Sequence, residues 1–443
     1  MVKGRIRFGA RRVQIGTLVR PHALLFIGVL LSFLAWALPW GNFVPRGFPK
    51  REPVTFSGSL LLAGWYVFFF IIAWGGFRLG RRIKPSERAE RVSAESYYLY
   101  FTLLAVIGVV YSYGYIALHD SQAISNGLFH QQFNEVRKVL PESAGVQTLR
   151  YASCLSGGIA IFELGRRRVR WLHLVNIALL VLATAVAARI LLIIAVIVAV
   201  GLTAQHLDRK GISLRRVVVS AAIGAAALFL ALTPFNYFRN AGSYRDVYGV
   251  HNPFLMNLDE VIRYLGMPFQ ASIAVANHVH SWPKLPSEAA SGLTTYMLPT
   301  YAQPATPPAV AQAELKYRTV TTIVESQTTN SVLAATYGVF GLATLAIIGF
   351  VAFVAAILAG HASRYVSYVS IASFVIAYCF AEFWRVYAFN AGVVQFLVGA
   401  TALWGIVGAS VDGRASGRWV RFEESVLAPL QQRRSKRSAP PIG

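Results

Sequence analysis

The sequence predicts an all-α, polytopic integral membrane protein, and three observations support this prediction. Of the 443 residues, 55% are hydrophobic and only 14% are charged, a composition too apolar for an ordinary soluble domain. The apolar residues gather in runs of about twenty, which is the length a helix needs to cross the hydrocarbon of a bilayer. The 42 Lys and Arg residues cluster in the short connections between these runs. Basic clusters of this kind set the orientation of membrane helices.

The apolar runs predict about ten transmembrane helices, within a range of about eight to twelve. The run 171–203 is too long for one crossing, so we expect a tight helical pair divided around 187–190. Each of the other runs corresponds to one helix. In chain order the runs cover 22–39, 56–77, 97–118, 147–164, 171–203, 217–232, 331–358, 366–383 and 386–409.

The membrane part of the chain is interrupted by one long polar excursion. The predicted parts are a basic cytoplasmic tail (1–21), helices 1–7 (22–233), one large external loop (234–330), helices 8–10 (331–410) and a second basic cytoplasmic tail (411–443). We find no internal repeat of the kind that marks many transporters.

The distribution of positive charge predicts the orientation. Roughly two thirds of the 42 Lys and Arg residues fall in the tails and in the connections assigned to the inside, such as GRRRVR at 165–170. An even number of helices then places both termini in the cytoplasm. We therefore expect a multi-pass protein of the cytoplasmic membrane with its large loop outside. Because orientation explains the net charge of +23, we expect no nucleic-acid partner.

The large external loop is expected to be the working surface of the protein, held in place by the helices. Asn257 and Glu260 have the spacing of a capping box, and apolar residues follow at helical spacing. Gly266 and Pro268 are expected to end this short amphipathic helix. A second short helix is expected over 314–325, so the loop combines short helices with irregular chain.

The sequence contains none of the common metal, phosphate-loop or dinucleotide motifs. Cys154 and Cys379 both fall in apolar runs and indicate no disulfide. His278 and His280 are two positions apart, a pattern too weak to indicate a metal site. We therefore expect neither a metal nor another cofactor.

Arginine at the outer membrane boundary is the most informative chemical signal. A charge close to hydrocarbon is costly and is tolerated where it faces a cavity or a partner, and the planar guanidinium suits phosphate oxygens. Other roles stay open: Arg189 could extend to the lipid headgroups. Arg263 could pair with Asp259 on a solvated helix face. Arg385 could pair with Glu382. The candidate ligands for a phosphate or pyrophosphate are Arg189, Arg239, Arg245, Arg263, Arg318 and Arg385.

The external loop also supplies groups that could take a proton from a sugar hydroxyl. A histidine has a suitable pKa, and a partly buried carboxylate can be tuned to the same task. A lone histidine in a loop is more often part of a polar surface, so the identity of the base stays open. The leading candidates are His251, His278, Asp246 and Glu260, and the loop also holds His280, Asp259 and Glu325.

Three stretches carry a resemblance to a known family. An arginine opens the apolar run AARILLIIAVIVAV, and the segment FNYFRNAG leads from a helix into the large loop. The chain re-enters the membrane with TTNSVLAATYGVFGLATLAIIGF, which holds Asn330, Tyr337 and Gly341. Over about 170–400 the chain resembles the O-antigen polymerase family, the oligosaccharide repeat-unit polymerases of the bacterial cell envelope.

The resemblance implies a metal-independent glycosyl transfer at the outer face of the cytoplasmic membrane. The donor would be an oligosaccharide linked to polyprenyl (undecaprenyl) pyrophosphate, and the acceptor would be a second lipid-linked repeat unit. Arginines would hold the pyrophosphate, with Tyr337 and Asn330 as further ligands, and a His or carboxylate would activate the acceptor hydroxyl. The product would be a surface polysaccharide. Membrane lipid, a flippase and a chain-length regulator are the expected partners.

Two other functions are consistent with the same features. An O-antigen-ligase-like enzyme would transfer the finished glycan to a different acceptor. A transporter or flippase of lipid-linked saccharide belongs to another class and should show repeated halves and charges near the middle of the membrane. The unusual charges of this chain instead lie beside one large loop, which favours an enzyme that acts outside.

Overall fold

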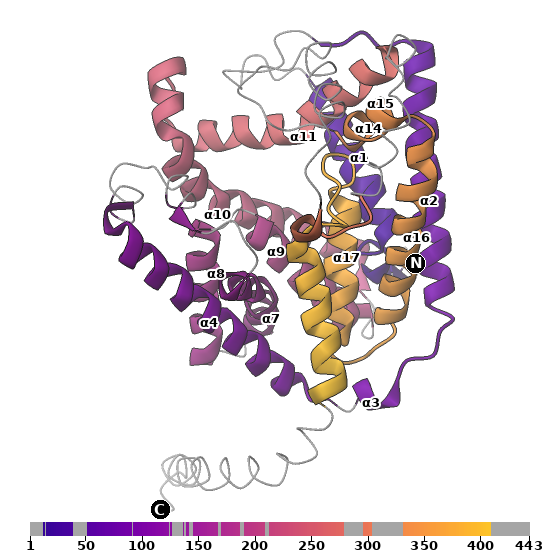
Figure 1. The fold of residues 1–443 in the computed structure, drawn as a ribbon. Coiled ribbons are helices and arrows are strands. Elements are labelled where there is room, and N and C mark those ends of the chain that lie inside the picture. The colour runs from indigo at the N-terminus through magenta and orange to yellow at the C-terminus, as the bar shows by residue number, and fades with distance from the viewer. Residues whose placement is uncertain are drawn as a thin grey trace, which may run out of the picture.

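The computed structural model describes residues 12–13, 15–38, 51–90, 92–123, 125, 136, 139–140, 145–166, 170–186, 190–208, 212–278, 296–303 and 331–408. Within these residues the fold is almost entirely helical (Figure 1). The two strands found there, β1 (Arg12–Val13) and β2 (Ile212–Ser213), form one short antiparallel pair.

The longer helices follow the apolar runs. In chain order they are α1 (Pro21–Ala37), α2 (Phe56–Gly80), α4 (Ala94–His119), α7 (Ser153–Gly165), α8 (Trp171–Val186), α9 (Ile190–Asp208), α10 (Leu214–Tyr248), α11 (Pro253–His278), α16 (Ala343–Ala362), α17 (Ile371–Ala381) and a last apolar helix, Gly392–Gly408. Shorter helical elements are η1 (Ile15–Thr17), α3 (Glu87–Glu90), η2 (Val146–Ala152), η5 (Thr300–Ala302), α14 (Val332–Ala335), α15 (Tyr337–Phe340) and η6 (Tyr368–Ser370).

Four of the described helices are long and apolar enough to cross a membrane: α2, α4, α9 and α16. Several shorter apolar helices accompany them, among them α1, α8 and Gly392–Gly408. Large apolar side chains such as Val110 of α4 (64% exposed) and Phe350 of α16 (59% exposed) lie on the outside of the bundle. An outer surface of this kind is expected where helices face lipid, so the apolar helices indicate a membrane protein.

Two details of the predicted runs can be compared with the helices. The division of 171–203 is confirmed, because α8 ends at Val186 and α9 begins at Ile190. The prediction of one continuous helix over 331–358 is wrong. The chain there forms α14, α15 and α16, and Gly341, with φ of +64°, separates the last two. A positive φ is incompatible with a continuous right-handed helix and is adopted most readily by glycine.

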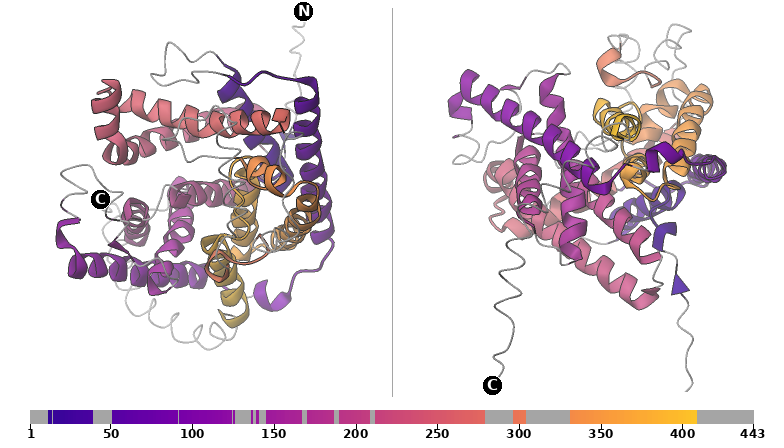
Figure 2. Two further views of the ribbon diagram at one scale, coloured as in Figure 1. Left: turned by 45° about the horizontal axis from the view of Figure 1, so that its top comes forward. Right: turned by 90° about the horizontal axis from the view of Figure 1, so that it is seen from below.

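The prediction of only short helices in the large loop is also wrong. Helix α10 continues to Tyr248, and α11 is a single helix of 26 residues. It reaches from the end of α10 across one end of the bundle to α1 and α2 (Figure 2, left). The expected helix over 314–325 lies outside the described residues.

The ends of α11 differ from the sequence prediction for identifiable reasons. Asn252, not Asn257, caps the helix: its Oδ1 accepts the backbone N–H groups of Phe254 (2.9 Å) and Leu255 (3.3 Å). Asn257 is fully buried and its Nδ2 donates to Phe229 O of α10 at 2.8 Å. Pro268 lies inside the helix and does not end it. Packing against α1, α2 and α10 offsets the cost of about 3 kcal/mol for an interior proline.

Candidate functional site

A chain of polar side chains links α10, the middle of α11 and the end of α17. Helix α11 contacts both α10 and α1, and α1 in turn contacts α17 (Figure 1). We call this set the α11 polar network, and its members are Tyr244, Asp259, Glu260, Arg263, Tyr264, Glu382 and Arg385.

The first half of the network joins α10 to α11. The hydroxyl of Tyr244 lies 2.5 Å from Asp259 Oδ2 and 3.0 Å from Glu260 Oε1. Arg263 Nη1 lies 3.6 Å from the same oxygen of Asp259. Asp259 is 0% exposed and Arg263 is 6% exposed, so the prediction of a solvated pair is wrong, although the two residues are neighbours. Burial and the two nearby carboxylates raise the pKa of Tyr244 well above its usual value, which keeps the phenol as a donor.

The second half joins α11 to the end of α17. Nε and Nη2 of Arg385 both lie 2.8 Å from Glu382 Oε2, which is the ion pair expected from their spacing. The hydroxyl of Tyr264 lies 3.2 Å from each oxygen of the same carboxylate. The guanidinium of Arg385 stacks over the Tyr264 ring, with Cζ 4.0 Å from its centroid. Arg263 and Tyr264 are consecutive in α11, so the two halves are attached to adjacent positions of that helix, on faces about 100° apart.

The network lies inside the bundle because α17 is short. Its 11 residues span about 17 Å, roughly half the thickness of bilayer hydrocarbon. The helix ends against the middle of α1, where a Cβ on Gly28 would lie 2.5 Å from the backbone oxygen of Ala381. Glu382 follows directly and is 5% exposed. Ionisable groups among apolar helices are costly, and they commonly mark a functional site.

Four predicted site residues lie away from this interior. Asp246 and His251 are exposed at the connection between α10 and α11. Arg245 lies there too, with Cζ 5.8 Å from the centroid of the Tyr237 ring. His278 is exposed at the far end of α11, about 27 Å along the helix from Glu260 at 1.5 Å per residue. The structure therefore does not bring His278 to the network.

Of the remaining predicted residues, only Tyr337 has a described side chain. The Tyr337 ring contacts Trp65 at 5.9 Å, and Trp65 stacks on Phe383 at 6.5 Å, so two aromatic rings separate it from Glu382. The backbone of Arg239 lies in α10, but its side chain is outside the described part. Arg189, Arg318 and Asn330 also lie outside the described residues.

Three polar residues in and around the interior, Tyr244, Tyr264 and Arg150, were not predicted as site residues from the sequence. Tyr244 and Tyr264 gave no signal, because a tyrosine near a membrane boundary is common. Arg150 opens the run 147–164 as Arg189 opens its own run, so the same criterion would have found it. Among the described residues no group of three or more His, Cys, Asp or Glu is placed to hold a metal.

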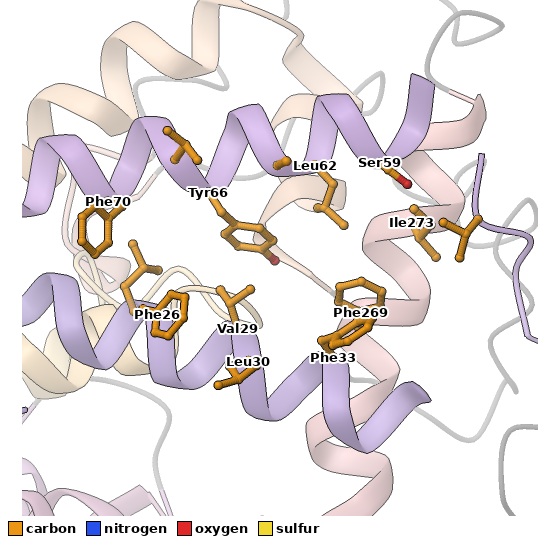
Figure 3. A pocket seen from close by; sticks show the side chains of 14 residues that line it. Phe26, Val29, Leu30, Phe33, Ser59, Leu62, Tyr66, Phe70, Phe269 and Ile273 are labelled. Atoms are coloured by element: carbon orange, nitrogen blue, oxygen red, sulfur yellow. The ribbon is translucent and has the colours of Figure 1, made fainter. Parts of the chain in front are cut away.

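An apolar groove of about 620 Å³ lies between α1 and α2 and ends at α11 (Figure 3). Phe269 and Ile273 of α11 form one end, close to Phe33 of α1, whose ring lies 5.3 Å from that of Phe269. Beyond this end, Gln270 Oε1 accepts a hydrogen bond from the indole N–H of Trp36. The groove therefore borders the part of α11 that follows the polar network.

In comparisons with protein-family models, with curated proteins and with solved structures, no match to the chain is found. The fold and the site define a helical membrane protein with a buried acid–arginine–tyrosine network. The resemblance to O-antigen polymerases stays a prediction from the sequence.

Proposed function

We propose that the chain is a membrane glycosyltransferase that polymerises polyprenyl-pyrophosphate-linked oligosaccharide repeat units. The observation that carries the proposal is the α11 polar network, in which two arginines and three carboxylates lie beside apolar helices. The chemistry needs cations where pyrophosphate departs and a base at the acceptor hydroxyl.

The proposed reaction assigns a role to each half of the network. The acceptor hydroxyl oxygen bonds to the anomeric carbon of the donor, and the bond from that carbon to the pyrophosphate oxygen breaks. Pyrophosphate leaves with the electron pair, and Arg263 and Arg385 stabilise its charge. The acceptor proton passes to a carboxylate. Glu260 is our choice of base, because it is the one leading candidate that the network contains and it is partly exposed.

The arrangement of the helices supports the proposed topology of about ten spans with both termini in the cytoplasm. Helices α2 and α16 run in the same direction, since Phe68 contacts the Gly349 position and Phe77 contacts the Gly360 position. The proposal places the start of both helices, and α11, at the outer face of the cytoplasmic membrane. A flippase would deliver the donor there, and a chain-length regulator would act on the product.

A deletion strain complemented with variants tests the proposal. The surface glycan is resolved by size after complementation with wild type, Glu260→Gln or Arg263→Lys. We expect single repeat units in the deletion strain and a loss of long chains with both variants. Glu95→Gln is the matched control, because the Arg170–Glu95 pair (3.3 Å) is well exposed and far from the network in sequence.

Other outcomes would contradict the polymerase proposal in distinct ways. Long chains accumulating on the lipid carrier would identify a ligase. Repeat units retained on the inner leaflet would identify a flippase. An unchanged glycan, with every variant present in the membrane at wild-type level, would exclude a role in this pathway.

A further inference from the structure

Arg150 is a buried arginine without an acidic partner among the described residues. It is 7% exposed, and its Nε is fully buried without a hydrogen-bond acceptor. Its Nη1 lies 3.1 Å from the Gln147 carbonyl and 3.4 Å from Ser112 Oγ, and its Nη2 lies 3.4 Å from the Tyr151 hydroxyl. These partners are neutral, so the positive charge has no described counter-charge. Buried charges are ordinarily paired, which makes this one exceptional.

Packing holds Arg150 inside the bundle. Its segment, η2, lies so close to α4 that a Cβ on Gly108 would clash with the backbone nitrogen of Arg150. Ser112 lies one turn further along α4 and about 10 Å from the end of that helix at His119. An arginine on a lipid-facing surface can extend to water, but a side chain this buried is not free to do so.

Two buried hydroxyls lie at the same level of the bundle. Ser153 Oγ and Thr184 Oγ1 are both fully buried without a hydrogen-bond partner. Ser153 follows Arg150 by three residues in a continuous helical segment, so the two lie on one side of it. Helices α7 and α8 are antiparallel and touch at Gly157 and Leu180. Ser153 lies one turn before Gly157 and Thr184 lies one turn after Leu180, so the two hydroxyls are at the same level of the bundle.

Contacts between α4 and α8 independently place Thr184 at the level of Arg150. Helices α4 and α8 run in the same direction, because Thr102 bonds to Asn176 and the Tyr113 hydroxyl donates to Leu182 O at 3.0 Å. Tyr113 is next to Ser112, which contacts Arg150. Figure 1 shows α4, α7 and α8 side by side, in agreement with their contacts. The three buried polar atoms without a hydrogen-bond partner therefore lie at one level of these three adjoining helices.

We propose that Arg150, Ser153 and Thr184 form a binding site for a phosphate oxyanion. The guanidinium supplies the opposite charge that the site lacks, and its fork suits phosphate oxygens. The hydroxyls add donors from two further helices, so the donors approach from several directions. A tetrahedral phosphate with three acceptor oxygens fits this arrangement better than a planar carboxylate does. The site is separate from the α11 polar network and stands whether or not the chain is a polymerase.

Thermal unfolding of the purified full-length protein in detergent tests the site. Inorganic pyrophosphate should raise the Tm in a saturable manner, because a ligand that binds only the folded state stabilises it. Arg150→Met should abolish the rise. Ser153→Ala and Thr184→Val should each weaken binding by about tenfold, as for one hydrogen bond to a charged group. Arg170→Met is the control, since Arg170 is 61% exposed and paired with Glu95, and it should keep the full response.

Two further measurements distinguish a phosphate-binding role of Arg150 from a purely structural one. Without ligand, Arg150→Met should keep or raise the Tm, since it removes a charge that no described group compensates. Arg150→Lys keeps the charge and should bind pyrophosphate more weakly than the wild type. This variant provides the test if Arg150→Met does not fold. The proposal would be overturned if Arg150→Met strongly lowered the Tm without ligand while pyrophosphate still raised the Tm of Arg150→Lys and Ser153→Ala as much as that of the wild type.

The source of the phosphate is distinguished in lipid nanodiscs. In discs of zwitterionic lipid, a rise of Tm with pyrophosphate that depends on Arg150 identifies a soluble or substrate phosphate. In discs containing phosphatidylglycerol, a higher Tm that depends on Arg150 and leaves no response to pyrophosphate identifies a lipid headgroup. If neither pyrophosphate nor the anionic lipid stabilises the wild type more than Arg150→Met, the site does not exist.

Discussion

At the scale of single residues, the charges of the α11 polar network are placed beside opposite charges. Arg385 lies 2.8 Å from Glu382, and Arg263 lies 3.6 Å from Asp259. Such pairs gain little over apolar residues of the same size, but breaking one leaves a buried charge alone. Arginines held in this way are already oriented when a phosphate group approaches. A stability cost of this kind is common where a site is kept for function.

Glu382→Gln should therefore destabilise the protein strongly. The variant leaves Arg385, whose side chain is 17% exposed, without its carboxylate, and the expected loss is about 3–5 kcal/mol. The double variant Glu382→Gln/Arg385→Met should recover most of that loss, because it removes the remaining charge. Reversible unfolding in detergent measures both. Equal losses in the single and double variants would show that the pair does not act as a unit.

Tyr244→Phe should change the dependence of stability on pH. Burial and the two carboxylates raise the pKa of Tyr244 in the folded state above its unfolded value. Its contribution is therefore fully present below the unfolded pKa of about 10 and is lost as the pH rises above it. Without the phenol, stability should fall by about 1–3 kcal/mol at neutral pH. Its decline between about pH 9 and 11 should be shallower than that of the wild type.

At the scale of the elements, the sequence predicted what depends on length and periodicity. The division between α8 and α9 follows from the thickness of a bilayer, and the Glu382–Arg385 pair follows from its spacing. The sequence could not show that Tyr264, more than a hundred residues away, joins that pair. Pro268 was misinterpreted because its effect depends on packing from other helices.

The contact between α1 and the end of α17 should depend on Gly28. A Cβ there would lie 2.5 Å from Ala381 O, so Gly28→Ala should displace the end of α17 and cost about 1–3 kcal/mol. Gly64 of α2 is the matched control, because a Cβ there meets nothing within 4 Å. Gly64→Ala should leave stability unchanged or raise it by up to about 1 kcal/mol. Unfolding of both variants under one condition makes the comparison.

At the scale of the whole molecule, the helices form a bundle with two chemically different ends. One end carries α11 and the start of α2 and α16, and the other carries the short basic connections. Apolar side chains cover the sides between them. The orientation of this bundle in a membrane follows from the charge distribution and is open to direct measurement.

Labelling of introduced cysteines tests the orientation. Cys154 and Cys379 are buried, so a maleimide that does not cross membranes should leave the wild type unlabelled. His278→Cys, at the exposed end of α11, should be labelled in intact cells. Arg170→Cys should be labelled only after the membrane is opened, since Arg170 belongs to a basic connection. Labelling of Arg170→Cys but not His278→Cys in intact cells would invert the topology.

The long reach of α11 also has a consequence for biosynthesis. The Ser32 hydroxyl donates to Leu265 O, and the Trp36 indole donates to Gln270, across 233 and 234 residues of chain. At roughly 5–20 residues per second of synthesis, the first membrane helix waits on the order of ten to fifty seconds for these partners. During that time its polar groups face lipid or an insertion factor. A nascent chain that stops before α11 should therefore be a preferred target of membrane quality control.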